Sequence, residues 1–342
     1  MNNLSVEDLA RRLQAIFSEV LQPANKGLYD DWLWRYYGHL SSYAGSRTRV
    51  QYVADLCRLA RFSPQDKVVL DAGCGFGAVS IILALMGARK VWGVDISARM
   101  LDTFNNIISR YEFGDRIETR LTSVTDTGIA DRSVDMVLSN EAISHYDDLD
   151  GFLREAAHVL VPNGVLIIAD GNNGSNPWIA RFTQEVWNRF ENGPVGEVHG
   201  HRVTEPYVQT RKRIIQQSIA SDLPPDTVEK LAQNTFGMIE EQIVEAVQKY
   251  RQTGVMPDSR FAPGKVPRNP ESGAYIERLF KPAQLARHIR QFGFEVRYYA
   301  YFGGAKGNPL IRTVNAIGTA LTPVSIAFAR AFRIVAKRLQ PV

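Results

Sequence analysis

The residues with the clearest chemical meaning are an acid at the end of an apolar run and the glycines that follow it. Residues 68–70 are apolar, Asp71 comes next, and an apolar segment occupies 78–86. Three glycines stand at alternate positions between them: Gly73, Gly75 and Gly77. This order predicts a buried parallel strand, a tight turn that a ligand can approach closely, and a helix with free N–H groups at its start. Together they predict a nucleotide-binding turn.

Two acids bear on which ligand this turn would hold. Gly73, Gly75 and Ala78 also fit the fingerprint of dinucleotide-binding proteins. However, a carboxylate at Asp71 suits a cationic amino group and disfavours an anionic pyrophosphate. Asp95 ends the next apolar run, 24 residues after Asp71. An acid there accepts both ribose hydroxyls of an adenosine, so Asp95 predicts an adenosine cofactor without choosing which one.

The glycine segment resembles the first motif of class I S-adenosylmethionine-dependent methyltransferases, and two later segments extend the resemblance over residues 64–172. Residues 134–137 are similar to the family's Phe-Asp-x-Val strand. Residues 160–166 are similar to its Leu-x-Pro-Gly-Gly-x-Leu turn, with Asn163 in place of one glycine. Asn tolerates the left-handed backbone that such a turn needs. The resemblance implies a doubly wound, mostly parallel α/β sheet of the Rossmann-like methyltransferase type, with S-adenosylmethionine as the cofactor.

The resemblance also implies a set of cofactor-binding residues on the glycine turn and at the ends of the following strands. They are Asp71, Gly73, Gly75, Gly77, Asp95, Ile96, Ser123, Val124 and Asn140. The family often has an acid near position 123 that hydrogen-bonds the adenine amino group. Here the residue is Ser123, so the adenine contact would depend on a serine or on a neighbouring backbone group. No Cys/His cluster has zinc-like spacing, and we expect no metal.

The loop after the fourth expected strand contains the candidate base. In the family this loop faces the transferred methyl group, and residues 141–145 resemble a Glu-Ala-x-x-His motif of sterol and related small-molecule methyltransferases. An imidazole titrates near neutral pH, so His145 is the candidate general base; a loop histidine that only bonds backbone is the alternative. We expect Glu141 to orient the cofactor or His145, or to be a solvent-facing acid. His199 and His201 could reach the acceptor, but a plain surface loop is favoured.

Five segments are predicted along the chain. They are a helical N-terminal cap (1–62), a cofactor-binding Rossmann-like core (63–172), a helical substrate-shaping insertion (173–275), a return to the core with the last helix and strand (276–305), and a basic apolar C-terminal helix or tail (306–342). The insertion follows the fifth strand, at the sheet edge where ligands bind in such folds. Within it we expect helices over 178–190, 205–221 and 226–250. The family's seventh strand has no clear counterpart in the sequence.

Charge is unevenly distributed along the 342 residues. The net charge is +4, yet no acid follows Glu295 and the last 47 positions carry seven basic residues, so the rest of the chain carries −3. Residues 314–329 are uncharged, which is short for a bilayer span of about 20 residues. Two interpretations stay open. Residues 310–342 lie on an anionic membrane surface, or they pack on the domain or on a second copy of the chain, as in a homodimer.

Composition narrows the class further. Apolar residues make up 45% and charged residues 22%, as in ordinary globular proteins. Cys74 lies in the glycine turn and the only other cysteine is Cys57, so we expect no structural disulfide and a cytoplasmic location, with peripheral attachment at the inner face of the membrane left open. Residues 1–5 lack the features of a secretion signal. The basic residues lie in an apolar tail without aromatic platforms, so no nucleic acid is expected.

The sequence therefore predicts an S-adenosylmethionine-dependent methyltransferase that acts on an oxygen of a small-molecule or lipid-linked acceptor, with a carboxylate or amine acceptor still open. Two alternatives remain. One is an NAD(P)-dependent oxidoreductase that uses the same glycine turn and Asp95. The other is a non-catalytic, membrane-associated binding protein that has kept a dead pocket.

Overall fold

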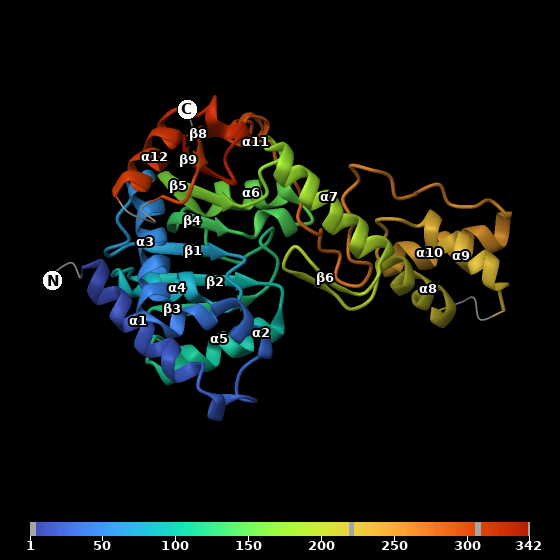
Figure 1. The fold of residues 1–342 in the computed structure, drawn as a ribbon, viewed down its shortest axis with the longest axis horizontal. Coiled ribbons are helices and arrows are strands. Elements are labelled where there is room, and N and C mark those ends of the chain that lie inside the picture. The colour runs from blue at the N-terminus through green and yellow to red at the C-terminus, as the bar shows by residue number, and fades with distance from the viewer. Residues whose placement is uncertain (1–4, 219–221, 305–308, 341–342) are drawn as a thin grey trace. The chain divides into compact units, whose positions relative to one another are not determined.

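The computed structural model describes residues 5–218, 222–304 and 309–340 (Figure 1). The predicted helix end at Ser221, the segment boundary at 305–306 and the last two residues lie outside this part of the chain. The chain divides into two units. Unit 1 comprises Met1–Ile143, Asp148–Gly171 and Lys281–Val342, and unit 2 comprises Ser144–Asp147 and Asn172–Phe280.

Within the described residues, unit 1 is built on a seven-stranded sheet of order β3-β2-β1-β4-β5-β9-β8. Its strands are β1 (Val68–Ala72), β2 (Lys90–Asp95), β3 (Ile117–Leu121), β4 (Val134–Asn140), β5 (Leu160–Asp170), β8 (Phe294–Tyr301) and β9 (Ala331–Arg338). The first five pair in parallel, and β9 is antiparallel to both β5 and β8. The predicted doubly wound, mostly parallel sheet is confirmed.

Helices flank this sheet and precede it. They are α1 (Val6–Val20), α2 (Asp31–Tyr37), α3 (Tyr43–Leu59), α4 (Ala78–Leu85), α5 (Ala98–Arg110), α6 (Leu149–Val159), α11 (Pro282–Arg290) and α12 (Pro309–Ala320). Helix α1 begins at a capping box, in which Ser5 Oγ accepts from Asp8 N at 3.1 Å and the Asp8 carboxylate accepts from Ser5 N at 3.3 Å. The apolar face of α1 is buried in the core, through Leu9, Leu13, Phe17 and Val20 among others.

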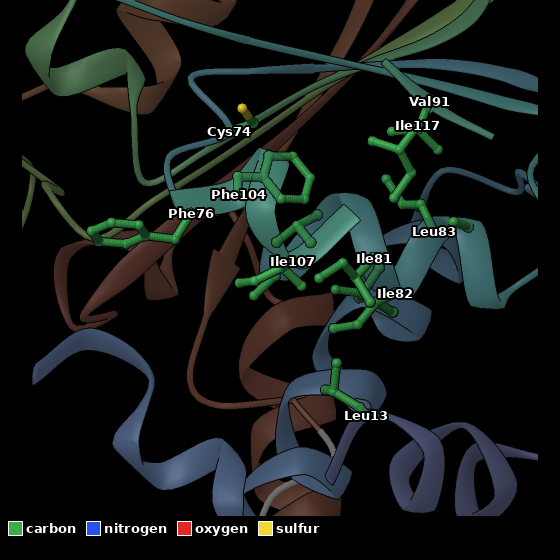
Figure 2. Close-up of a cluster of buried hydrophobic side chains, with 14 of the residues drawn as sticks. Leu13, Cys74, Phe76, Ile81, Ile82, Leu83, Val91, Phe104, Ile107 and Ile117 are labelled. Carbon is green, nitrogen blue, oxygen red and sulfur yellow. The ribbon is translucent and has the colours of Figure 1, made fainter. Parts of the chain in front are cut away.

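The glycine turn is supported from behind by a packed apolar cluster (Figure 2). Every residue of β1 is buried, and so are Phe76 and Phe104, from the turn and from α5. Gly77 has a φ of +78°, and a Cβ there would lie 2.1 Å from the Phe104 ring. Only glycine permits both this backbone and this contact. The third glycine is therefore needed to seat α5 against the turn.

The aromatic segment around α2 packs mainly on the core of unit 1. Trp32, Trp34 and Tyr37 are half-buried against it, and Trp34 Nε1 donates to Leu21 O at 3.1 Å. Tyr36 is more exposed and lies with its ring centroid 6.3 Å from that of Phe76. Most of these rings therefore serve packing of the core.

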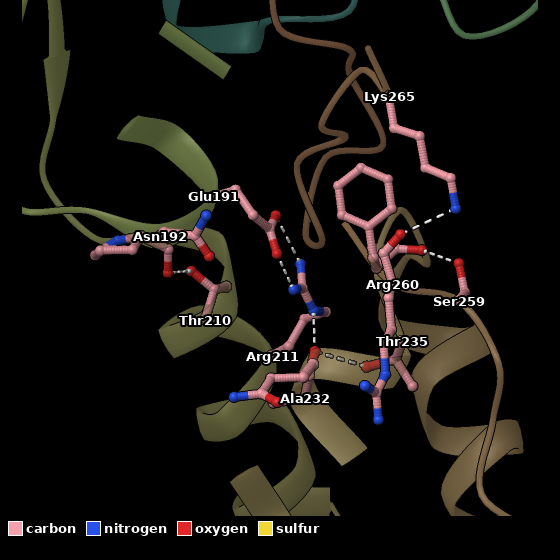
Figure 3. Close-up of polar contacts among 12 residues, drawn as sticks. Glu191, Asn192, Thr210, Arg211, Ala232, Thr235, Ser259, Arg260 and Lys265 are labelled. Atoms are coloured by element: carbon pink, nitrogen blue, oxygen red, sulfur yellow. Dashed lines mark hydrogen bonds and ion pairs between the residues drawn. The ribbon is translucent and has the colours of Figure 1, made fainter. Parts of the chain in front are cut away.

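Unit 2 is a helical layer with a two-stranded ribbon. Its elements are α7 (Pro177–Asn192), β6 (Gly196–Val198), β7 (His201–Val203), α8 (Tyr207–Ser218), α9 (Pro225–Asn234) and α10 (Glu240–Thr253). Helices α8, α9 and α10 bury a small apolar core. Beside it, the fully buried Arg211 guanidinium pairs with the Glu191 carboxylate, and Arg211 Nε donates to Ala232 O at 2.8 Å (Figure 3). These contacts satisfy a charge that would otherwise be costly to bury.

The helix predicted over 226–250 is wrong, because the chain forms two helices there. Helix α9 ends at Asn234 and α10 begins at Glu240. Between them Gly237 has a φ of +74°, and Phe236 N donates to Ser259 O at 2.8 Å. A non-local backbone contact and a left-handed glycine thus interrupt a continuous helical pattern.

The predicted basic helix or tail at 306–342 is wrong beyond Arg330. Residues 331–338 form β9, which lies in the sheet between β5 and β8. Phe332, Ile334 and Ala336 alternate along it and are fully buried, so the residue pattern has the period of a strand. This strand is the seventh strand that the sequence analysis did not locate. Among the described helices we find none whose length and apolarity suffice to cross a bilayer.

Candidate active site

The glycine turn after β1 has the geometry of a ligand-binding loop. Gly73, Gly75 and Gly77 all have positive φ, at +74°, +54° and +78°. The N–H groups of Gly73 and Cys74 both donate to Val94 O, which fixes the turn to β2. A Cβ on Gly75 would meet only Met100 Sδ, at 3.7 Å, so the backbone of Gly75 is open to a ligand.

Asp95 closes this turn against the start of α5. Its Oδ2 accepts from Gly75 N and its Oδ1 from Ser97 N, each at 2.9 Å. Ser97 is the N-cap of α5. Between these residues Ile96 is 61% exposed, which is unusual for a large apolar side chain. The acid thus positions both the turn and an exposed apolar residue next to it.

Asp71 is more deeply buried than a surface ligand group would be. It is 2% exposed, and its Oδ2 accepts a hydrogen bond from Ser80 Oγ at 2.6 Å. Burial raises the pKa of Asp71 to about 6, while the Ser80 bond and the positive charge of Arg49 act in the opposite direction. A cation beside this carboxylate would favour its ionised form.

Helix α3 contributes two residues that the sequence analysis missed. Arg49 lies with its guanidinium carbon 5.4 Å from the centre of the Tyr52 ring, and among the described residues its buried Nε has no hydrogen-bond partner. Tyr52 donates its hydroxyl proton to Asn140 Oδ1 at 2.6 Å, and burial raises the pKa of Tyr52 to about 12. Their one sequence signal is the three-residue spacing, which places both on one face of α3.

The other predicted residues of unit 1 are anchored by local contacts. Ser123 Oγ lies 2.8 Å from Thr125 Oγ1 and accepts from Thr125 N at 3.2 Å, and Val124 is buried. Glu141 has a φ of +53°, and its Oε2 accepts from Gly171 N at 2.9 Å. This contact ties the end of β4 to the end of β5, a role that the sequence did not indicate.

Unit 2 brings His145 beside a carboxylate that the sequence analysis missed, that of Glu277. His145 Nδ1 lies 3.0 Å from Tyr275 O, and a carbonyl can only accept, so Nδ1 carries a proton. His145 Nε2 lies 3.7 Å from Glu277 Oε1. Asn172 Nδ2 donates to the other Glu277 oxygen. In neutral His145 the lone pair is therefore on Nε2, the nitrogen that faces the Glu277 carboxylate.

The two histidines of the insertion differ in their surroundings. His201 Nε2 lies 3.8 Å from Glu277 Oε1, so two imidazoles flank one carboxylate. His199 pairs with a different carboxylate, since its Nε2 lies 2.6 Å from Glu185 Oε2. Glu277 has a φ of +52°, the kind of backbone strain that collects at functional sites. No local motif marks Glu277, because its neighbours come from positions 145, 172 and 201.

An open cavity of about 530 Å³ in unit 2 is lined by residues of α7 and of the 261–264 loop, including Arg181, Trp187 and Phe261, and by none of the predicted site residues. In the described part of the chain, no three His, Cys, Asp or Glu side chains are grouped closely enough to hold a metal ion.

The residues of the glycine turn fit S-adenosylmethionine. The cofactor's amino acid end carries an ammonium and a carboxylate, and unit 1 offers the buried Asp71 carboxylate together with the orphaned Nε of Arg49. The open backbone at Gly75 and the exposed side chain of Ile96 suit a sugar and an apolar ring face. The sheet order and this turn are those of a Rossmann-like S-adenosylmethionine-binding fold.

Comparison with known proteins agrees with this class. Residues 70–168 match the family model described as Methyltransferase domain. This segment belongs to that family, within the S-adenosylmethionine-dependent methyltransferases.

Individual similar proteins cover only part of the chain. A demethylmenaquinone methyltransferase of Tropheryma whipplei is 38% identical over 102 residues, which are 30% of this chain and 41% of that protein. A ubiquinone biosynthesis O-methyltransferase of Parvibaculum lavamentivorans is 32% identical over 44% of this chain and 62% of that protein. The solved geranyl diphosphate C-methyltransferase of Streptomyces coelicolor A3(2) aligns with a TM-score of 0.41 and 14% identity, over 85% of this chain and 78% of that chain. The chain thus spans about two fifths of the first of these relatives.

Proposed function

We propose that the protein transfers a methyl group from S-adenosylmethionine to an oxygen of a small-molecule acceptor. The observation that carries the proposal is the acid-flanked glycine turn, with Asp71 on one strand and Asp95 on the next, inside the segment that matches a methyltransferase domain. When bound, the cofactor supplies a methyl group on a positively charged sulfur.

In this proposal the cofactor is held along the C-terminal edge of the sheet of unit 1. Asp71 pairs with its ammonium group and Arg49 with its carboxylate. Asp95 accepts from the ribose hydroxyls, the role that an acid has at this position in adenosine-binding folds. The glycine backbone, Ile96, Ser123, Val124 and Asn140 complete the contacts. Opposite charges at the two ends of one amino acid group would select a zwitterion over a diphosphate.

His145 is the proposed general base. Its Nδ1 proton is committed to Tyr275 O, so the Nε2 lone pair is free to take the acceptor's proton. Glu277 stabilises the imidazolium that forms, and Asn172 holds Glu277 in place. His201, on the other side of the same carboxylate, is proposed to orient the acceptor. Glu141 is then a positioning residue that joins β4 to β5.

The acceptor is proposed to be apolar or lipid-linked. Two similar proteins are named for demethylmenaquinone and for ubiquinone biosynthesis, which supports an acceptor of this kind. Such an acceptor is reached at a membrane surface, so a peripheral location at the inner face of the membrane is part of the proposal.

Calorimetric titration of the full chain tests the cofactor half of the proposal. We expect micromolar binding of S-adenosylhomocysteine and none of NADH or NADPH. Micromolar binding of a nicotinamide cofactor without binding of S-adenosylhomocysteine would instead establish the oxidoreductase alternative.

A further inference from the structure

Helix α12 of unit 1 has the reverse of the usual burial pattern, with its large apolar side chains exposed and a polar side chain buried. The only buried residue recorded in it is polar, Asn315. The large apolar side chains of α12 and of the turn that follows are 48–81% exposed. We call them the apolar face: Leu310, Ile311, Val314, Ile317, Leu321, Val324 and Phe328. A contiguous exposed set of this kind marks an interaction surface.

Specific contacts hold the helix in this orientation at the edge of the sheet, beside β8 (Figure 1). Asn315 Nδ2 donates to Gly304 O at 3.0 Å. A Cβ on Gly318 would lie 2.7 Å from the Phe302 ring, so the helix approaches that ring closely. Thr322 Oγ1 accepts from Ala300 N, in β8, at 2.7 Å. Small and polar residues therefore face the protein, and the apolar face points away from it.

The apolar face begins on α12 and continues past its end at Ala320, since Leu321, Val324 and Phe328 lie in the turn and the short segment that follow. Six of its members recur at intervals of four and three residues, at positions 310, 314, 317, 321, 324 and 328. Arg312, between Leu310 and Val314, is the one charged residue from position 310 to position 328, and Arg330 follows Phe328; both arginines are exposed. No acidic residue occurs after Glu295. The surface is thus an exposed apolar face with one arginine near its start and another just past its end.

These charges favour an anionic bilayer over a second copy of the chain. In a two-fold dimer built on this face, the arginines of both copies would meet around one apolar contact, and this part of the chain offers no acid to pair with them. An anionic bilayer offers an apolar interior and negative phosphates at the depth that arginine side chains can reach.

We propose that the apolar face inserts into the boundary between headgroups and acyl chains of an anionic bilayer, with Arg312 and Arg330 at the level of the phosphates. The purpose of this membrane contact rests on the proposed function, because the contact would bring the enzyme to a lipid-linked acceptor. The contact itself needs neither cofactor nor acceptor.

Co-sedimentation of the full chain with vesicles of phosphatidylglycerol and phosphatidylcholine tests the proposal. We expect binding that increases with the phosphatidylglycerol fraction and decreases with salt. The triple variant Val314→Ser, Ile317→Ser, Val324→Ser should reduce the partition coefficient by about tenfold or more, since three inserted apolar side chains are lost. The matched control is Val195→Ser with Val255→Ser, two exposed valines of unit 2, which should bind as the wild type does.

Two results would overturn the proposal. One is equal binding of the triple variant and the wild type, or no binding by either, with unchanged thermal unfolding of both. The other is a stable dimer in sedimentation velocity without vesicles that the triple variant converts to a monomer, which would assign the face to a second copy. Because vesicle binding is measured without cofactor, failure here is distinct from failure of the methyl transfer.

Discussion

Among single residues, His145 and Glu277 carry the proposed proton transfer. The Tyr275 carbonyl selects the tautomer of His145, and Glu277 supplies a negative charge near the nitrogen that is left free. The effect of such a pair appears in the transition state rather than in substrate binding.

Replacement of His145 by alanine should lower kcat about 10²–10⁴-fold and leave binding of S-adenosylhomocysteine unchanged, because a positioned base is lost without a cofactor contact. Glu277→Gln should lower kcat with little change in KM. The control is Glu185→Gln, which alters the equivalent pair with His199 and should leave kcat as it is. Steady-state kinetics that show equal losses for both glutamine variants would contradict the assignment.

Asp71 should show opposite effects on stability and on binding. Its pKa of about 6 lies above the unfolded value of 3.8, so the folded state holds the proton more tightly and its stability decreases as pH rises from about 4 to 6. Asp71→Asn should therefore stabilise the free protein at pH 8 by on the order of 1–3 kcal/mol, with no gain at pH below about 4. It should weaken binding of S-adenosylhomocysteine at least ~10-fold, through loss of the ion pair.

Denaturant unfolding at both pH values and calorimetry check these effects of Asp71→Asn. Lower stability at pH 8 together with unchanged cofactor binding would contradict the role given to Asp71.

The sequence predicted the residues of this site that lie within one motif, and it missed those that come from elsewhere. Asp71 and Asp95 end successive strands, and parallel strands bring their ends to one edge of a sheet. Arg49 and Glu277 have no such local mark. Each becomes visible only when segments more than 20 residues apart are folded together.

At the scale of elements, two glycines of the turn are required for different reasons, packing and ligand approach, which the sequence alone does not distinguish. Gly77 serves packing, since a Cβ there would meet Phe104 at 2.1 Å, whereas a Cβ on Gly75 would make only an ordinary contact with Met100 Sδ at 3.7 Å. Both have positive φ.

Gly77→Ala should therefore lower the free energy of unfolding by about 2–4 kcal/mol, from backbone strain and overpacking. Gly75→Ala should cost only about 1–2 kcal/mol, from backbone strain alone, and should abolish cofactor binding by filling the ligand's space. Urea unfolding and titration with S-adenosylhomocysteine distinguish the two variants. An equal loss of stability in both would show that the packing of Phe104 is not what requires Gly77.

The elements that were predicted wrongly from the sequence depend on non-local pairing. Residues 331–338 lie beside a long apolar stretch and carry three basic side chains, which disguise a strand of eight residues. Their partners, β5 and β8, are distant in the chain, so the pairing of β9 between them is evident only in the folded sheet. The break between α9 and α10 likewise depends on a contact with Ser259.

At the scale of the whole molecule, each unit has its own apolar core and its own buried polar anchor. In unit 2 the anchor is the Arg211–Glu191 pair. Removing one partner leaves a buried charge without compensation.

Glu191→Ala should consequently destabilise unit 2 by about 3–5 kcal/mol. S-adenosylhomocysteine at roughly 100 times its Kd should stabilise unit 1 by about 2.7 kcal/mol. Scanning calorimetry of the full chain should show the first effect on one transition and the second on the other. The control is Glu229→Gln, which alters the half-exposed pair with Lys212 and should change stability by less than about 1 kcal/mol. If S-adenosylhomocysteine shifted only the transition that Glu191→Ala affects, the assignment of cofactor binding to unit 1 would be contradicted.

The most direct test of the account is the transfer of labelled methyl from S-adenosylmethionine by the full chain into fractionated cell extract, beside the His145→Ala variant. We expect label in the organic, lipid-soluble fraction with the wild type and at least ~100-fold less with the variant. Binding of S-adenosylhomocysteine without label in any fraction would contradict it and would leave a binding protein with a dead pocket.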